Sequence, residues 1–264
     1  MTRKTFVSLA LIAVLVWNSC NVLAQSALNY LGICFGGSNL HLQDQHASPL
    51  IYRSNGIAPS LQFIHQSDVY IHFAEVSFAY NKLKALPDNF TTQHYAGRVR
   101  YALMTNLFRS NERLHIYAGG SIQSFFNRSD YSYTYLTIPN VRAITSWYWS
   151  HSFDLASQVE YSFASRKFIT ARLFIPLISN VSRPEYSPSG DYNYTTNSWD
   201  MKTFGKTVFL TDNLSFNAHI AFQTLLAEKF NLQLSYEFQH VKYTKPVELK
   251  MYSNAFRIGL FYCF

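Results

Sequence analysis

The residues best suited to hydrolytic chemistry are a histidine, a serine and an aspartate that lie close together, His151, Ser152 and Asp154. A base, a nucleophile and a carboxylate that orients the base can hydrolyse an ester when they lie within hydrogen-bond reach. In an extended strand, however, Ser152 and Asp154 point to one face and His151 points to the other. The spacing therefore argues against a hydrolase at this position.

A second candidate is the pair Asp44 and His46, which are separated by one residue. A protease that activates water with an Asp-His pair also needs a second acidic pair, and the chain contains no Asp-any-Asp sequence. No cluster of Cys and His has the spacing of a metal site, and no glycine-rich phosphate loop occurs. We predict no catalytic residues, no metal site and no cofactor.

The elements that carry these residues are predicted to be β-strands. In residues 168–177, Ile169, Leu173 and Leu177 share a face opposite Arg172, a period of two that is typical of a strand with one apolar face. Similar segments come in pairs joined by short polar turns at residues 67–68, 109–112, 164–167 and 227–229. Longer polar connections separate the pairs at residues 43–55, 83–92, 128–142, 181–213 and 244–249.

Short turns that alternate with long loops are typical of an up-and-down barrel in an outer membrane, where the short turns face the periplasm. We predict an all-β, transmembrane antiparallel β-barrel of about ten strands, with about eight to twelve as the range. As an alternative, a weak strand pattern in residues 201–210 allows a short additional hairpin within residues 198–211, which would raise the count to about twelve. The alternation is ambiguous around Glu75, where we expect a β-bulge. Because lipid cannot hydrogen-bond a free sheet edge, the first and last strands must pair.

The composition fits a membrane barrel, because 17% of the residues are aromatic and only 14% are charged. The basic residues are scattered, which predicts no nucleic-acid partner. Residues 1–24 have the parts of a secretory signal peptide, with Arg3 and Lys4 before an apolar run and Val22 and Ala24 before the predicted cleavage site. No later apolar stretch is long enough for a membrane helix. Residues 25–264 are predicted to form one barrel domain.

Polar residues on the other faces of the strands are predicted to point into the lumen. The signs of their charges nearly balance, and a barrel of this size is filled by side chains, so we expect a charge-paired plug. The predicted network consists of Arg98, Arg100, Asp154, Glu160, Arg172, Glu237 and Arg257. Cys34 and Cys263 are also predicted to face inward on the first and last strands, where a seam disulfide forms only if their heights match.

The last strand ends with a specific pattern. Arg257, Gly259, Tyr262 and Phe264 follow the order polar, any, Gly, two of any, aromatic, any, terminal aromatic. This resembles the C-terminal signal of bacterial outer-membrane β-barrel proteins, which the outer-membrane assembly machinery recognises. The resemblance implies that this chain is inserted into the cell outer membrane as a multi-pass barrel. It implies no single function, because small barrels include adhesins, channels and enzymes.

The predicted outer loops are the remaining functional lead. Tyrosine among serine and asparagine makes adaptable recognition surfaces, although aromatic residues that only crown the barrel above the membrane have the same pattern. The candidates for loop recognition are Tyr131, Tyr133, Tyr135, Tyr192, Tyr194 and Trp199.

We therefore predict a non-enzymatic integral outer-membrane protein that displays extracellular loops for binding or has a structural role in the envelope. Its predicted partners are outer-membrane lipids, lipopolysaccharide and an unknown extracellular ligand. The alternatives are a porin-like channel for small solutes and an outer-leaflet hydrolase of the lipid A deacylase or surface protease type.

Overall fold

A computed structural model describes residues 28–85, 90–108, 113–133, 144–164, 167–184, 203–245 and 247–264. All regular elements in these ranges are strands, and none of the described residues form a helix that is long and apolar enough to cross a membrane. The predicted signal peptide, residues 1–24, lies outside the described residues. The strands are β1 (Leu28–Asp44), β2 (Ser48–Ile57), β3 (Ser60–Gln66), β4 (Tyr70–Ala85), β5 (Phe90–Asn106), β6 (Leu114–Tyr133), β7 (Ile144–Ala164), β8 (Lys167–Ser182), β9 (Lys206–Phe209), β10 (Asn213–Ala227), β11 (Phe230–Tyr243) and β12 (Leu249–Cys263).

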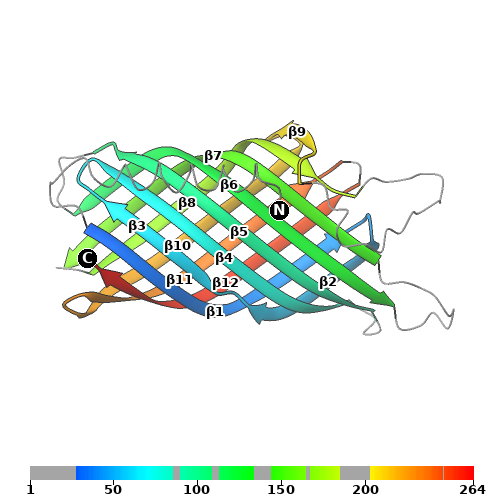
Figure 1. The fold of residues 1–264 in the computed structure, drawn as a ribbon, viewed down its shortest axis with the longest axis horizontal. Helices are drawn as coiled ribbons and strands as arrows, with labels where there is room; N and C mark the ends of the chain where they lie inside the picture. The colour runs from blue at the N-terminus through cyan, green and yellow to red at the C-terminus, as the bar shows by residue number, and fades with distance from the viewer. Residues whose placement is uncertain are drawn as a thin grey trace, which may run out of the picture.

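The strands form a closed antiparallel ring, as Figure 1 shows, because β12 pairs with β1 along its whole length. Both β2 and β3 pair with β1 and β4, so they are two parts of one strand. The break falls at Ala58 and Pro59, because proline has no N–H to donate to the ladder. Likewise, β9 and β10 both pair with β8. The twelve strands therefore occupy ten positions, which confirms the predicted ten-strand barrel.

The alternative hairpin within residues 198–211 does not form in residues 203–211, the part that the structure describes. There the segment contributes only β9, which continues into β10 through a turn at residues 210–212 and adds no position to the ring. The expected bulge near Glu75 is also wrong, because the pairings of β4 with β3 and β5 contain no register shift. A shift occurs instead between β7 and β8 at Phe153 and Asp154, and it leaves both Leu177 and Ile178 on the outer surface.

Side chains alternate between an apolar outer wall and the lumen. Leu173, for example, is 37% exposed, whereas its neighbours Arg172 and Phe174 are 6% and 1% exposed. Large apolar residues are exposed in this way on each of the long strands, and together they form a belt around the barrel. Such a surface suits hydrocarbon rather than water.

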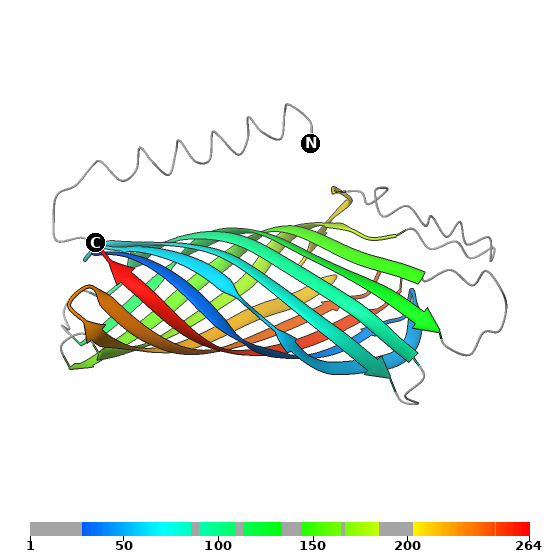
Figure 2. The same cartoon turned by 60° about the horizontal axis from the view of Figure 1, so that its bottom comes forward.

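The strands are longer than a membrane requires. Strands β6 and β7 have 20 and 21 residues, about twice the 9 to 11 that cross a bilayer. We call the end with Leu28 and Phe264 the turn end and the opposite end the loop end; Figure 2 shows how far the barrel extends between them. Turns at the turn end lie where they were predicted at Ser67 and Asp68 and at residues 228–229. The predicted turn at 164–167 begins where β7 ends and finishes where β8 begins, while residues 109–112 and 165–166 lie outside the described residues.

The predicted long loops are wrong where they overlap the strands at the loop end. Strands β1 and β2 occupy most of residues 43–55 and are joined by residues 45–47. Both limits of the loops predicted at 83–92 and 181–213, the first limit of 128–142 and the last of 244–249 likewise fall inside strands, whereas residue 142 lies outside the described residues. The reason is an inverted pattern in this part of the barrel, where apolar residues such as Leu42 and Leu83 are buried in the lumen and polar residues face outward.

Two apolar clusters fill the lumen on either side of a charged layer. The outer cluster, at the loop end, consists of Leu40, Leu42, Tyr52, Leu83, Ala85, Phe125, Tyr131, Tyr148, Val181, Val208, Val241, Tyr243, Leu249 and Met251. The inner cluster, toward the turn end, consists of Tyr30, Cys34, Ile64, Ile71, Phe73, Ala102, Met104, Tyr117, Ala156, Phe174 and Phe261. The charged side chains between the two clusters are therefore packed against apolar residues on both sides.

Candidate functional site in the lumen

The structure places all seven residues of the predicted polar network inside the barrel. Each is 6% exposed or less, and they come from five strands, β5, β7, β8, β11 and β12. An eighth residue, Glu75 on β4, joins them and is 4% exposed. Four arginines thus face four carboxylates, which is the condition under which buried charges are tolerated.

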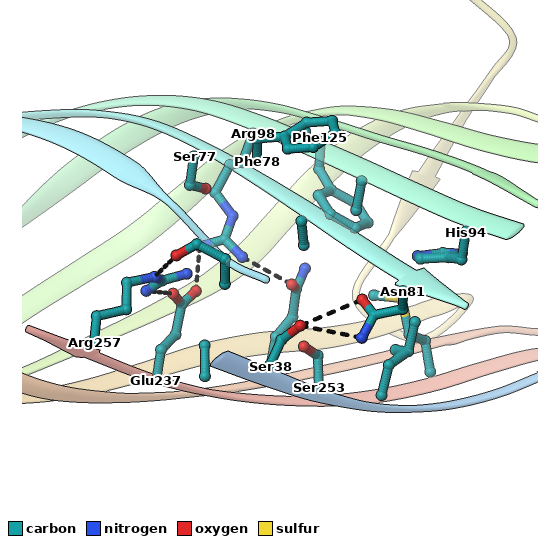
Figure 3. Close-up of a pocket in the computed structure, with 18 residues that line it drawn as sticks. Ser38, Ser77, Phe78, Asn81, His94, Arg98, Phe125, Glu237, Ser253 and Arg257 are labelled. Carbon is teal, nitrogen blue, oxygen red and sulfur yellow. Dashed lines mark hydrogen bonds and ion pairs between the residues drawn. The ribbon is translucent and has the colours of Figure 1, made fainter. Parts of the chain in front are cut away.

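The centre of the layer is Glu237 on β11, which accepts hydrogen bonds from two arginines (Figure 3). One is Arg98 on β5, and the other is Arg257 on β12, whose Nη1 lies 2.5 Å from Glu237 Oε2. Strands β5 and β11 have four positions of the ring between them on either side, so the contact between Arg98 and Glu237 spans the lumen.

Each arginine at the centre has a further partner. Arg98 donates a second hydrogen bond to Gln239, with a distance of 2.7 Å from Nη2 to Oε1. Arg257 Nε donates to the carbonyl oxygen of Ala58 at 2.8 Å, which is in the break between β2 and β3. The break caused by Pro59 therefore provides a backbone acceptor to the charged layer.

Glu75 and Arg100 extend the layer around the wall. Glu75 Oε2 lies 3.6 Å from Arg98 Nη1 and 3.7 Å from Arg100 Nη1. Arg100 also donates to Asn217 Oδ1 at 2.9 Å and to Gln123. Because Asn217 Nδ2 in turn donates to Glu237 Oε1 at 2.5 Å, the contacts form one connected network.

Aromatic rings separate two of the arginines. The guanidinium of Arg100 lies 3.8 Å from the ring centroid of Phe174, and that of Arg172 lies 4.4 Å from the centroid of Phe73. The two rings stack on each other with centroids 6.1 Å apart. This cation–aromatic column lets the inner cluster shield two positive charges from each other.

The remaining charged residues lie nearer the two ends. At the loop end, Arg183 Nη2 donates to Asp44 Oδ1 at 2.6 Å, and Ser146 Oγ donates to Asp44 Oδ2 at 2.5 Å. Toward the turn end, Gln66 on β3 donates a hydrogen bond to Glu160 on β7 at 3.1 Å. Arg172 on β8 donates to Gln158 on β7 at 2.6 Å. Side chains thus cross the lumen at several heights.

Two small cavities lie in the part of the lumen that the structure describes. The cavity beside Glu237 that Figure 3 shows has a volume of about 40 Å³, and a second beside Arg100 and Pro176 has about 20 Å³. A water molecule needs roughly 10 to 15 Å³ of such volume, so each cavity has room for only a few waters.

The residues considered for hydrolysis do not form a catalytic group. His151 lies on the outer wall, where its Nε2 is 3.1 Å from the carbonyl oxygen of Thr203. Ser152 and Asp154 face the lumen, and Asp154 accepts a hydrogen bond from Ser121 at 3.1 Å. In the other candidate, Asp44 is engaged with Arg183 inside the barrel. Among the described residues, no group of His, Cys, Asp and Glu could hold a metal ion.

The placement of the loop recognition candidates differs from the prediction. Tyr131 is not a loop residue: it lies on β6, is fully buried in the outer cluster and packs edge-on against Tyr52 with ring centroids 5.2 Å apart. Tyr133 is the last residue of β6 and pairs with Phe90. The other four candidates, Tyr135, Tyr192, Tyr194 and Trp199, lie outside the described residues.

The predicted assembly signal and the two cysteines lie at the seam between β1 and β12. Arg257 and Gly259 face the lumen, whereas Tyr262 and Phe264 are 39% and 59% exposed on the outer wall. Cys34 and Cys263 are free cysteines. Cys34 is opposite Gly259 and Cys263 is opposite Tyr30, an offset of four residues that corresponds to roughly 13 Å along the strands. The heights of the two cysteines do not match, so the condition for a seam disulfide is not met.

The sequence-based reasoning missed Glu75 and Arg183. Glu75 was missed because its strand also carries apolar residues, Ile71 and Phe73, on the lumen face. Arg183 follows β8 directly, in a segment that the polar composition assigned to a loop. His219 was missed although its signal was present, since it lies between outward-facing Ala218 and Ile220 on a predicted strand.

Comparisons with known proteins agree on the fold. No family model and no curated relative matches the chain. Among solved structures, the translocator domain of the autotransporter NalP from Neisseria meningitidis has a TM-score of 0.50 at 6% identity, covering 99% of this chain and 97% of that one. Neisserial surface protein A has a TM-score of 0.39 at 8% identity, covering 91% of this chain and 100% of that one. A major outer membrane protein from Thermus thermophilus has a TM-score of 0.38 at 8% identity, with coverages of 91% and 100%. The likeness to the NalP translocator domain is one of fold: the chain is a closed antiparallel β-barrel.

Proposed function

We propose that the protein does not conduct solutes and acts through the outer part of the barrel, which carries loops for an extracellular ligand or for an envelope-structural role. The observation that carries the proposal is the contact between Arg98 and Glu237, which joins opposite walls of the lumen. The free volumes of about 40 and 20 Å³ support it, because a solute pathway needs a continuous opening.

The form of the barrel supports a display role. The outer cluster packs the lumen at the loop end, so that the extended strands make a rigid support for the connections between them. A rigid scaffold with variable connections is a common way to position a binding surface.

Conductance of the purified protein in planar lipid bilayers tests the proposal. We expect no stepwise increase in current. We also expect that vesicles containing the protein do not swell when they are placed in a solution of a small sugar. The protein recovered from the same vesicles must migrate differently on electrophoresis before and after boiling, which shows that the folded barrel was present. Unitary steps from folded protein would contradict the proposal and favour the channel alternative.

A further inference from the structure

A group of basic residues lies on the outer wall beside the apolar belt, toward the loop end. Tyr80 and Tyr95 are opposite each other on β4 and β5, and their ring centroids are 5.1 Å apart. The next two outward residues of β4 are Lys82 and Lys84, and both are exposed. Arg53 on β2 is exposed as well and is directly opposite Lys84. We call Arg53, Lys82 and Lys84 the basic patch.

The arrangement of the basic patch is unfavourable without an anion. Side chains directly opposite each other on antiparallel strands have Cβ atoms about 5 Å apart, and like charges there destabilise the sheet. Within the described part of the chain, no acidic side chain forms an ion pair with any of the three residues. The flanking partners of Arg53 and Lys84 on the adjoining strands are His41 and Thr91.

Another basic pair at the same end of the barrel shows the contrast. Lys242 and Lys250 are opposite each other on β11 and β12, and both lie close to Glu248, at 3.7 and 2.8 Å. There the chain provides the carboxylate that two adjacent cations require. The basic patch has the same cross-strand geometry and lacks such a carboxylate in the described residues.

We propose that the basic patch binds the phosphate groups of lipid A, the glycolipid of the outer leaflet. Residues two apart on a strand are about 7 Å apart, so the three cations can contact one bisphosphorylated headgroup together. Below the patch, Ile57 is opposite Tyr80, and Phe78 is 46% exposed on the same face, which provides an apolar track for the acyl chains. Basic residues next to a membrane surface attract anionic lipid in this way.

Native mass spectrometry of the purified barrel with added bisphosphorylated lipid A tests this site. We expect the wild type to retain one lipid A molecule. Because each basic residue near a lipid surface contributes about fivefold in affinity, K82Q/K84Q is expected to bind about 25-fold more weakly. The matched control K242Q/K250Q removes the same charge at the same end of the barrel and is expected to bind like the wild type.

Two further measurements on the wild-type protein, with other lipids in place of bisphosphorylated lipid A, identify the ligand. Dephosphorylated lipid A should be retained far less than the bisphosphorylated form, and phosphatidylglycerol should not compete at equal concentration. Equal loss in both double variants, equal retention of dephosphorylated lipid A, or effective competition by phosphatidylglycerol would each overturn the proposal. The result does not depend on whether the lumen conducts, since the patch lies on the outer wall.

Discussion

Arg98 and Glu237 are in contact although their strands lie on opposite sides of the barrel. Glu237 also accepts a hydrogen bond from Arg257, so two buried arginines share one carboxylate. The contact therefore joins opposite walls of the lumen and pairs charges that would otherwise be costly to bury.

Loss of the central carboxylate is expected to destabilise the barrel strongly. In E237Q, the side chain keeps its size but leaves Arg98 and Arg257 without their shared counter-charge. Removal of one partner from a buried ion pair costs about 3 to 5 kcal/mol. Urea-induced unfolding in detergent, followed by tryptophan fluorescence and by migration of unboiled protein on electrophoresis, measures this change.

A surface ion pair provides the control for this variant. Arg128 and Asp130 form a salt bridge at 3.0 Å, with side chains 29% and 25% exposed, so D130N is expected to cost less than about 1 kcal/mol. The replacement of Arg98, Glu237 and Arg257 together by apolar residues of similar size should recover much of the stability. Equal stability of E237Q and D130N would contradict the view that Glu237 holds the lumen together.

The sequence predicted the membrane-embedded half of the barrel better than the outer half, for a physical reason. Next to lipid, apolar residues such as Ile169 and Leu173 must face outward, so the period of two appears as apolar out and polar in. Above the belt, water surrounds the wall and the lumen is packed, so Leu42 and Tyr52 face inward beneath polar outer neighbours. The inverted pattern at the loop end is what made strands β1 and β2 resemble a loop.

The terminal strand is expected to act as an assembly signal in the cell. F264A keeps the backbone hydrogen bonds that Phe264 exchanges with Asn29 and removes only the outward ring. If the assembly machinery recognises this ring, the amount of protein in the outer membrane falls several-fold, while refolding of the purified chain into detergent changes little. Quantitative immunoblots of membrane fractions, together with refolding yields, separate the two effects.

Leu260 is the matched control because it lies on the same outward face of β12 and is 46% exposed. L260A also removes apolar contact with lipid but lies outside the four positions of the signal. Similar losses for L260A and F264A in cells would show that only lipid contact is involved.

The loop between β11 and β12 is expected to respond to acid through Glu248. A hydrogen bond from Lys250 lowers the pKa of Glu248 below its usual value. A carboxylate with a lowered pKa in the folded protein stabilises the fold above its ordinary pKa, and this contribution is lost as the pH falls through the lowered value. The pairing with Lys250 should thus persist at pH values near 4.5 and disappear below them.

Nuclear magnetic resonance titration of the Glu248 carboxyl carbon in detergent measures this pKa directly. The variant K250M should return the pKa toward the ordinary value, whereas K206M, on β9, should leave it unchanged. A Glu248 pKa that does not move in K250M would show that the hydrogen bond is not formed in solution.

The register of the seam between β1 and β12 can be tested by a new cysteine. Asn29 and Phe264 exchange both backbone hydrogen bonds, so pairs at odd offsets from them, including Cys34 and Gly259, are not hydrogen-bonded to each other. Side chains approach most closely in such pairs, with Cα atoms about 4.5 Å apart. A Cβ added at Gly259 would lie 3.5 Å from the Cβ of Cys34, which is within the range of a disulfide.

We therefore expect G259C to form a disulfide with Cys34 under mild oxidation and to leave Cys263 as the single free thiol. Mass spectrometry after thiol alkylation counts the free thiols, and the closed seam should also raise the temperature at which unboiled protein loses its folded migration. The wild type, in which Cys34 and Cys263 are four residues out of register, should keep two free thiols under the same treatment.

A bond between Cys34 and Cys263 in the wild type, or two unreacted thiols at Cys34 and residue 259 in the variant, would mean that β12 meets β1 in a different register. Because a shift of one residue would turn Arg257 out of the lumen and into lipid, the same experiment also tests the position of the charged layer.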